Sequence, residues 1–242
     1  MSVVKESAVS HKYILRKFFE LGDLRSYEKG DWICGNETGA CDFIHYIKYG
    51  YVKAYSETDK EHVHIIFDVN EIFPILKLDD SQDRRVRYGA ISKVKIYNIH
   101  RDHVIQKIKS DLAFSNSVLA SVLSLYRVQA DRVDNLEHRE AYQRVVNRIL
   151  FLVARFGVQQ EDGSYVLSRI FTHKLIANTL NLSRESVSRE IMQLQELGLL
   201  MRSPGGMLIT DIHKLAVELN WPISSNMWGL LKEVCPTPQM SV

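Results

Sequence analysis

The spacing of apolar residues changes twice along the chain, from helical to alternating and back to helical. Residues 10–21 place apolar side chains at helical spacing and stop at Gly22, which predicts a short amphipathic helix. After it, β-branched and aromatic runs alternate with glycines and polar residues, at positions 32–34, 43–47, 51–55 and 62–67. Short strands at close spacing are typical of a small antiparallel barrel or roll.

A long helical pattern begins at Arg101, and no glycine or proline interrupts it before residue 156. One row is spaced alternately by three and four after an initial four: Ile108, Leu112, Ser115, Leu119, Val122, Tyr126, Gln129, Val133 and Leu136. Such a row is the seam of a coiled coil. We therefore expect a dimer interface at Leu112, Leu119, Val122, Tyr126 and Val133. A helix buried in one globular core is the alternative, and the length of the seam favours the dimer.

A second apolar row on this helical stretch would pack against the roll: Val104, Ile105, Phe114, Val118 and Leu125. Residues 135–140 are polar enough to form a hinge after the seam. A further helix should follow, ending at Arg155 and Gly157. Its apolar face comprises Val145, Val146, Ile149, Leu150, Leu152, Val153 and Phe156. We expect a loop and a short strand at residues 158–168.

Residues 172–202 combine two short helical patterns with a turn between them. The first helix has one apolar face, formed by Leu175, Ile176, Thr179 and Leu180. Asn181-Leu182 predicts the turn, and Ser183 is a good N-cap for the second helix. The inward stripe of that second helix comprises Val187, Ile191, Leu194 and Leu197. The pattern is that of a helix-turn-helix.

Polar side chains occupy the opposite face of the second helix near its start: Arg184, Glu185, Ser188 and Arg189. A recognition helix places such side chains against base edges in the major groove. The fork of an arginine can bond guanine O6 and N7 together, and a glutamate can accept from cytosine N4. An ordinary solvated surface helix is the alternative. A glycine turn at 203–206 between two apolar runs predicts the hairpin of a wing, so DNA binding is the favoured interpretation.

The segment Ser183-Arg184-Glu185-Ser186-Val187-Ser188-Arg189 resembles the Ser-Arg-Glu-(Thr/Ser)-Val-x-Arg motif of the CRP/FNR superfamily of bacterial transcription regulators. The resemblance implies that Arg184 and Arg189 contact guanines. It further implies that Glu185 contacts a cytosine or an adenine-opposed position and that Ser186 touches phosphate. The predicted DNA-binding set is completed by Thr172, His173, Ser183 and Ser188.

A dimer presents two recognition helices related by a two-fold axis. Their targets on double-stranded DNA should then be half-sites about 34 Å apart that form an inverted repeat. The resemblance also implies contact with RNA polymerase. The expected partners are therefore DNA, a second copy of the chain and the polymerase.

The alternating half resembles the cyclic-nucleotide-binding β-roll of the same superfamily. Residues 43–52 look like its apolar strand, glycine and Tyr-Val-Lys segment, and residues 90–96 match a closing strand. Asn70-Glu71-Ile72-Phe73 occupies the place of its Gly-Glu-x-x segment. The resemblance puts an effector site at Glu71, Arg84 and Arg85, although Arg85 stands where the family has a small hydroxyl residue. An effector-free pocket is favoured over a cyclic nucleotide or another small ligand.

Two other chemistries are less well supported. His62-x-His64 with Glu71 is similar to a cupin metal motif, but Glu71 lies seven positions beyond His64 where that motif has three or four. Solvent-facing strand histidines are preferred, and we expect no enzyme activity and no metal. No cysteine precedes Cys34, so no iron-sulfur cluster is expected. Cys34 and Cys41 are interpreted as core thiols rather than a redox pair, and the third cysteine is Cys235.

Composition bounds the class of protein. The chain has 242 residues, 45% of them hydrophobic, which suffices for two domains with separate cores. Its net charge of +2 means that any basic surface must be local. It contains no run of about 18 apolar residues and no signal-peptide core at its start, so a cytoplasmic location without a membrane partner is expected.

The sequence therefore predicts an α+β protein. An antiparallel, cyclic-nucleotide-binding-like β-roll should occupy residues 1–100, and a dimerisation helix with its hinge residues 101–137. A winged helix-turn-helix should occupy residues 138–220. The tail, residues 221–242, has no assigned role.

Overall fold

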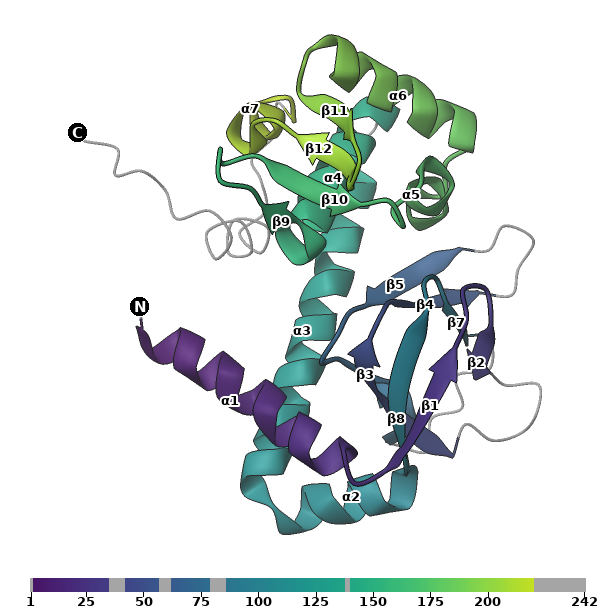
Figure 1. The fold of residues 1–242 in the computed structure, drawn as a ribbon, viewed down its shortest axis with the longest axis vertical. Helices are drawn as coiled ribbons and strands as arrows, with labels where there is room; N and C mark the ends of the chain where they lie inside the picture. The colour runs from purple at the N-terminus through teal and green to yellow at the C-terminus, as the bar shows by residue number, and fades with distance from the viewer. Residues whose placement is uncertain (1, 35–41, 57–61, 79–85, 138–139, 220–242) are drawn as a thin grey trace. The chain divides into compact units, whose positions relative to one another are not determined.

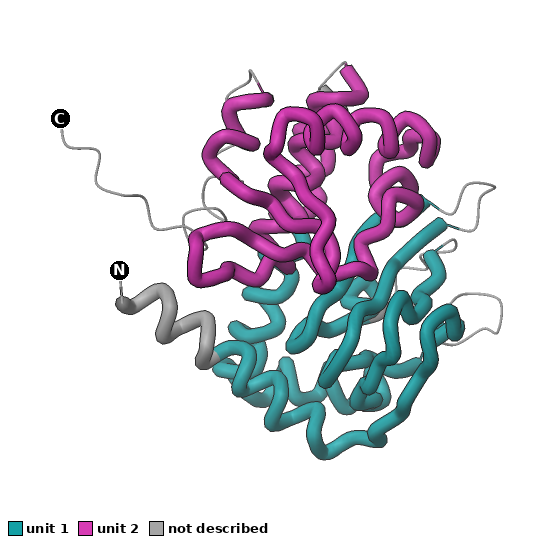
Figure 2. The backbone as a smooth tube through the Cα atoms, turned by 45° about the horizontal axis from the view of Figure 1, so that its top comes forward, with its two compact units in different colours: residues 1–126 teal, residues 127–242 magenta. Residues whose placement is uncertain are grey.

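The computed structural model describes residues 2–34, 42–56, 62–78, 86–137 and 140–219. The chain forms two compact units, residues 1–126 and 127–242, which Figure 2 shows in different colours. The boundary falls within one long helix, α3 (Leu112–Glu137).

The first unit contains two antiparallel four-stranded sheets (Figure 1). One has the strand order β1-β8-β3-β6, and the other has the order β2-β7-β4-β5. The strands are β1 (Asp23–Tyr27), β2 (Trp32–Cys34), β3 (Phe43–Tyr49), β4 (Val52–Ser56), β5 (Val63–Phe67), β6 (Ile72–Phe73), β7 (Val86–Ala90) and β8 (Val94–His100). A short 3-10 helix, η2 (Ile75–Leu78), follows β6. The predicted antiparallel roll is confirmed.

Side-chain alternation along the strands divides the core of this unit into two clusters. Val94 and Ile96 of β8 pack with residues from both sheets, including Phe67 and Phe73. On the other face of β8, Tyr97 and Ile99 belong to a second cluster. That cluster includes residues of three helices: α1 (Ser2–Phe19), α2 (Arg101–Ser110) and α3. Each large apolar side chain fully buried in this way contributes about 1.5–3 kcal/mol.

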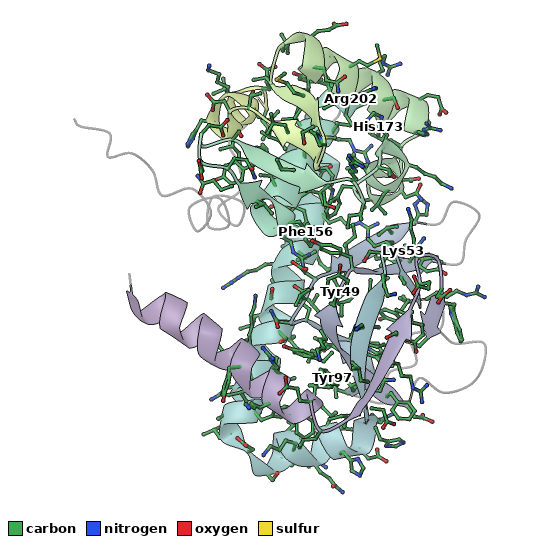
Figure 3. All side chains as sticks on the ribbon, viewed as in Figure 1. Tyr49, Lys53, Tyr97, Phe156, His173 and Arg202 are labelled. Atoms are coloured by element: carbon green, nitrogen blue, oxygen red, sulfur yellow. The ribbon has the colours of Figure 1, made fainter. Side chains whose placement is uncertain are left out.

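Several strand boundaries differ from the prediction. β1 carries no apolar alternation and was missed, because it is held in the sheet by backbone pairing with β8. β3 continues through Lys48 and Tyr49, which the sequence assigned to a turn. Tyr49 pairs with Lys95 of β8 across a register shift after Ile47, and the Lys48 ammonium donates to the Tyr97 hydroxyl at 2.8 Å (Figure 3 labels Tyr97). The single closing strand predicted at 90–96 is divided, because Ala90 ends β7, residues 91–93 form a turn, and residues 94–96 begin β8.

The prediction of one uninterrupted helix from Arg101 is wrong, because the helix breaks at Asp111. This residue is extended, with φ −135° and ψ 105°, and separates α2 from α3. Its Oδ1 accepts from the Phe114 N–H at 3.0 Å, and its Oδ2 pairs with Lys107 Nζ at 2.8 Å. An aspartate that bonds neighbouring backbone competes with the helix in this way. Ile108, the first residue of the predicted seam, therefore lies on α2 rather than on α3.

The described part of the second unit holds the end of α3, four further helices and a four-stranded antiparallel sheet ordered β11-β12-β10-β9. These elements are α4 (Ala141–Phe156), β9 (Val158–Gln159), β10 (Tyr165–Ser168), α5 (His173–Leu180), α6 (Arg184–Glu196), β11 (Leu200–Ser203), β12 (Gly206–Ile209) and α7 (Ile212–Val217). The predicted helix ending at Gly157 and the helix-turn-helix with its hairpin are confirmed. The tail predicted at 221–242 lies outside the described residues, and the sequence analysis did not predict α7.

The predicted hinge begins too early. α3 continues through Glu137, and Asn135 is buried and donates from Nδ2 to the Arg144 carbonyl at 3.2 Å. A polar side chain that finds a buried partner can stay helical, which sequence alone does not reveal. α4 is buried on nearly all sides, Asn147 and Arg148 included.

Candidate nucleic-acid interface

Two polar caps define the helix-turn-helix. Thr172 Oγ1 accepts from the Leu175 N–H at 3.2 Å and begins α5. Asn181 ends α5 in the left-handed region with φ 55°, a conformation that asparagine tolerates. Ser183 Oγ then accepts from the Ser186 N–H at 3.0 Å and begins α6. The turn and the N-cap predicted at Asn181 and Ser183 are confirmed.

The inner face of α6 fixes its orientation in the second unit. Val187, Ile191 and Leu194 are fully buried, as the stripe predicted. Leu197 is not part of this stripe, because it is the C-cap of α6 and 53% exposed. The guanidinium of Arg144 in α4 donates to the carbonyl of Leu180 at the end of α5. These contacts tie both helices to α4.

The outer face of α6 carries the residues predicted to contact DNA. Arg184, Glu185 and Arg189 are exposed, while Ser186 and Ser188 are half-buried. An open surface depression runs along this face and is lined by Arg184, Glu185, Ser188, Arg189, Glu190, Met192, Gln193 and Glu196. The polar side chains at the start of the helix are therefore available to a ligand.

Arg189 is held by its neighbour in sequence. Its Nε and Nη2 donate to Glu190 Oε1 at 3.2 Å and 3.0 Å. The Arg189 side chain is 72% exposed, whereas that of Glu190 is 9% exposed. A mostly buried carboxylate thus orients an exposed guanidinium, and the sequence analysis gave Glu190 no role.

His173 joins α5 to the outer face of α6. Its Nδ1 lies 2.9 Å from Ser188 Oγ. Burial lowers the pKa of His173 below its ordinary value of 6.5, and the nearby charges of Arg184 and Arg202 lower the pKa further. Arg202 belongs to β11 and was not among the predicted site residues. Figure 3 labels His173 and Arg202 in this unit.

The predicted wing is the hairpin of β11 and β12. Arg202 pairs with Met207 and Ser203 with Gly206. Gly206 has φ 144°, and a Cβ there would lie 2.1 Å from the Leu167 carbonyl oxygen. Only glycine fits so close to β10 at this turn. The wing therefore keeps Arg202 on a hairpin that is paired with β10 through β12.

Of the residues expected to bind an effector, Arg84 and Arg85 lie outside the described residues. Glu71 Oε2 accepts from the Asp68 N–H at 2.9 Å within a tight turn before β6. Asn70, in the glycine position, has φ 68°, and its Oδ1 accepts from the Tyr46 hydroxyl at 2.8 Å. The turn thus keeps a conformation typical of glycine while the glutamate carboxylate bonds the backbone of the turn itself.

The residues expected at a dimer interface project from α3. All five are exposed: Leu112, Leu119, Val122, Tyr126 and Val133. Val104, Phe114 and Val118 of the second predicted row are buried in the first unit, while Ile105 is half-buried. The second row is therefore largely covered by its own unit, whereas these five residues of α3 are exposed.

Other site chemistry was searched for in the described parts of the chain. They contain no group of three or more His, Cys, Asp or Glu side chains placed to hold a metal ion. His62 and His64 are half-buried rather than solvent-facing. Cys34 is buried, as expected of a core thiol, and Cys41 lies outside the described residues. No helix among the described residues is long and apolar enough to cross a membrane.

Sequence comparison connects this geometry to known proteins. Residues 143–217 match the family model of the Crp-like helix-turn-helix domain. The chain is 24% identical over 157 residues to the global nitrogen regulator of Nostoc sp. (strain PCC 7120), covering 64% of this chain and 66% of that protein. It is also 24% identical over 157 residues to the CRP-like cAMP-activated global transcriptional regulator of Mycobacterium tuberculosis, covering 65% of this chain and 70% of that protein. The match thus spans about two thirds of these relatives.

Solved structures share the fold over most of the chain. FixK2 from Bradyrhizobium japonicum superposes with a TM-score of 0.68 at 20% identity, covering 81% of this chain and 96% of that one. A variant of CooA from Carboxydothermus hydrogenoformans gives a TM-score of 0.69 at 18% identity, covering 84% and 90%. These likenesses define a β-roll protein with a winged helix-turn-helix.

The matched family model identifies residues 143–217 as a Crp-like helix-turn-helix domain. Both relatives described above are named as regulators.

Proposed function

We propose that the protein acts as a homodimer that binds an inverted repeat in double-stranded DNA, with α6 of each subunit in the major groove. The observation that carries this proposal is the orientation of α6. Arg184, Glu185 and Arg189 are exposed at its start, while Val187 and Ile191 are fully buried on the other face. A helix held in this way offers its N-terminal side chains to base edges.

The polar residues take separate roles in this proposal. Arg184 and Arg189 each bond a guanine through O6 and N7, and Glu185 accepts from a cytosine N4. Such contacts carry sequence information. The phosphate contacts, which position the protein without selecting bases, come from the helix starts and their flanks: Thr172, His173, Ser183 and Ser186. Ser188 lies beside Arg184 and Arg189 on the base-facing side of α6.

Homodimerisation is supported by the exposed apolar row on α3. Leu119 is 54% exposed and Tyr126 is 70% exposed. Apolar side chains at three- and four-residue spacing bury one another when two such helices pair. A two-fold axis along this seam would put two copies of α6 about one turn of DNA apart, roughly 34 Å.

We propose that DNA binding does not require a cyclic nucleotide. Glu71, the residue expected to hold the ribose, already accepts from the Asp68 N–H. Aromatic rings of the protein itself line the interior of the roll. The ring centroids of Phe73 and Tyr88 are 5.2 Å apart, and those of Phe67 and Phe73 are 5.4 Å apart. These contacts favour an effector-independent regulator over one activated by cyclic AMP, as the M. tuberculosis relative is named. Contact with RNA polymerase stays a prediction from family resemblance.

The test is a binding selection from a library of genomic fragments, performed with the purified protein at fixed salt, because salt alone changes such affinities strongly. The selection is repeated with cyclic AMP and with cyclic di-GMP. Enrichment of the same inverted repeat in all three selections is the expected result. A repeat enriched only with a nucleotide would overturn effector independence, and the absence of any repeat would overturn sequence-specific binding.

A further inference from the structure

Three basic side chains from three different elements converge at the edge of the recognition surface. His173 is the first residue of α5, Arg184 the first residue of α6, and Arg202 lies on β11. Both guanidinium groups act electrostatically on the His173 ring. Neither arginine has an acidic partner within salt-bridge distance in the described parts of the chain. The two guanidinium groups thus place positive charge beside the ring, although Glu185 lines the same depression as Arg184.

His173 is constrained rather than free at this position. The residue is half-buried, and its Nδ1 lies 2.9 Å from Ser188 Oγ. The charged groups that act on the ring are Arg184 from α6 and Arg202 from β11. Since burial and both arginines disfavour the imidazolium, the pKa of His173 lies below 6.5 in the free protein. At neutral pH the ring is therefore uncharged before any ligand arrives.

We propose that His173 takes up a proton when the protein binds DNA, so that DNA affinity rises as the pH falls. The inference rests on the proposed function, because it requires DNA on the outer face of α6. Arg202 would attract a backbone phosphate to the same place as the ring, next to the base-contacting Arg184. A phosphate next to the ring offsets positive charge of the nearby guanidinium groups, which favours the charged imidazole.

The proton comes from solvent, and no other bond is made or broken. A neutral imidazole has one N–H donor and one acceptor nitrogen, whereas the imidazolium donates from both nitrogens. In the charged ring Nδ1–H donates to Ser188 Oγ, and Nε2–H is left for the phosphate. Ser188 then no longer needs its hydroxyl hydrogen for His173. That hydrogen can be donated to the DNA from the base-facing side of α6, beside Arg184 and Arg189.

The direction of the pH effect follows from the two states of the ring. DNA binding raises the pKa of His173 from its depressed value in the free protein. The gain in affinity is complete below the pKa of the free protein and is lost as the pH rises through the pKa of the complex. If binding raises the pKa by one, affinity on the acid side is about tenfold higher per subunit.

The experiment measures the dissociation constant for the selected inverted repeat from pH 5.5 to 8.5 at fixed salt. Wild-type protein should gain about tenfold or more in affinity toward low pH. His173→Gln keeps a side chain that can bond Ser188 but cannot titrate, so its affinity should be nearly independent of pH. His213→Gln is the matched control, because His213 is an exposed histidine on α7 of the same unit. Its pH dependence should equal that of the wild type.

Calorimetry of the wild type in buffers of different ionisation enthalpy counts the protons directly and does not depend on how the variant folds. For a pKa rise of one, uptake of about half a proton per subunit is expected at a pH midway between the two pKa values. No uptake, or a pH dependence that persists in His173→Gln, would overturn the inference. Failure of the wild type to bind the repeat at any pH would instead overturn the proposed function.

Discussion

Replacing Arg189 by alanine should abolish selectivity at one base of each half-site while leaving the fold intact. A bidentate arginine–guanine pair contributes about 1–3 kcal/mol of discrimination against other bases. Because about 1.4 kcal/mol corresponds to a tenfold change, each half-site should lose roughly 5- to 150-fold in preference for its guanine. A full inverted repeat has two half-sites, so the preference for guanine is lost at both.

The cost to stability should be much smaller. Arg189 bonds Glu190 Oε1 with a guanidinium that is 72% exposed. Ion pairs with such exposure typically contribute about 0.2–1 kcal/mol. The free energy of unfolding should therefore fall by no more than about 1 kcal/mol, and the dimer should persist.

The assay compares the operators selected by wild type, Arg189→Ala and Arg189→Lys, followed by fluorescence anisotropy on matched and guanine-substituted sites. Arg189→Lys keeps the charge but lacks the planar fork. It should retain the salt dependence of binding and lose most of the selectivity. If Arg189→Ala selects the same base at every position as the wild type, the assignment of Arg189 to a guanine is wrong.

Two further predictions concern the rest of the chain. Leu119→Glu should give a folded monomer in sedimentation, because Leu119 is 54% exposed within one chain but lies on the predicted seam. Leu123→Glu is the control and should stay dimeric, because Leu123 is 49% exposed but lies off the seam. Equal sedimentation of the two variants would contradict the predicted seam. Burial raises the pKa of Asp131 to about 6, so the folded state binds this proton more tightly than the unfolded state, in which the pKa is 3.8. The resulting stabilisation is complete below pH 3.8 and is lost as the pH rises through 6. Asp131→Asn should then need more urea to unfold at pH 7, with a free energy of unfolding higher by up to about 3 kcal/mol, because one pKa unit corresponds to about 1.36 kcal/mol. If the free energy of unfolding of this variant depends on pH between 4 and 6 as that of the wild type does, this account is wrong.

Local patterns predicted the recognition unit well. Ser183 and Asn181 specify their own caps and turn, since each acts on backbone groups within a few residues. The buried positions Val187 and Ile191 follow from helical periodicity alone. The roll was likewise predictable from alternating strands, although β1 was missed because its residues are mostly exposed.

Predictions failed where a polar side chain found a particular partner. Asp111 breaks the helix by bonding the Phe114 N–H, and Asn135 stays helical by bonding the Arg144 carbonyl. Both residues are compatible with a helix, a hinge or a cap when seen only in sequence. Leu197 fitted the helical spacing of the stripe but falls at the C-cap.

The sequence by itself determined the α+β architecture, the helix-turn-helix with its hairpin and the chemistry of the recognition helix. Only the tertiary structure decided which distant side chains meet. Arg202 acts on His173 from a strand 29 positions further along the chain, and Ser188 reaches the same ring from α6. Periodicity and capping depend on neighbours within one or two turns, whereas these contacts depend on how β11, α5 and α6 pack, which no local pattern encodes.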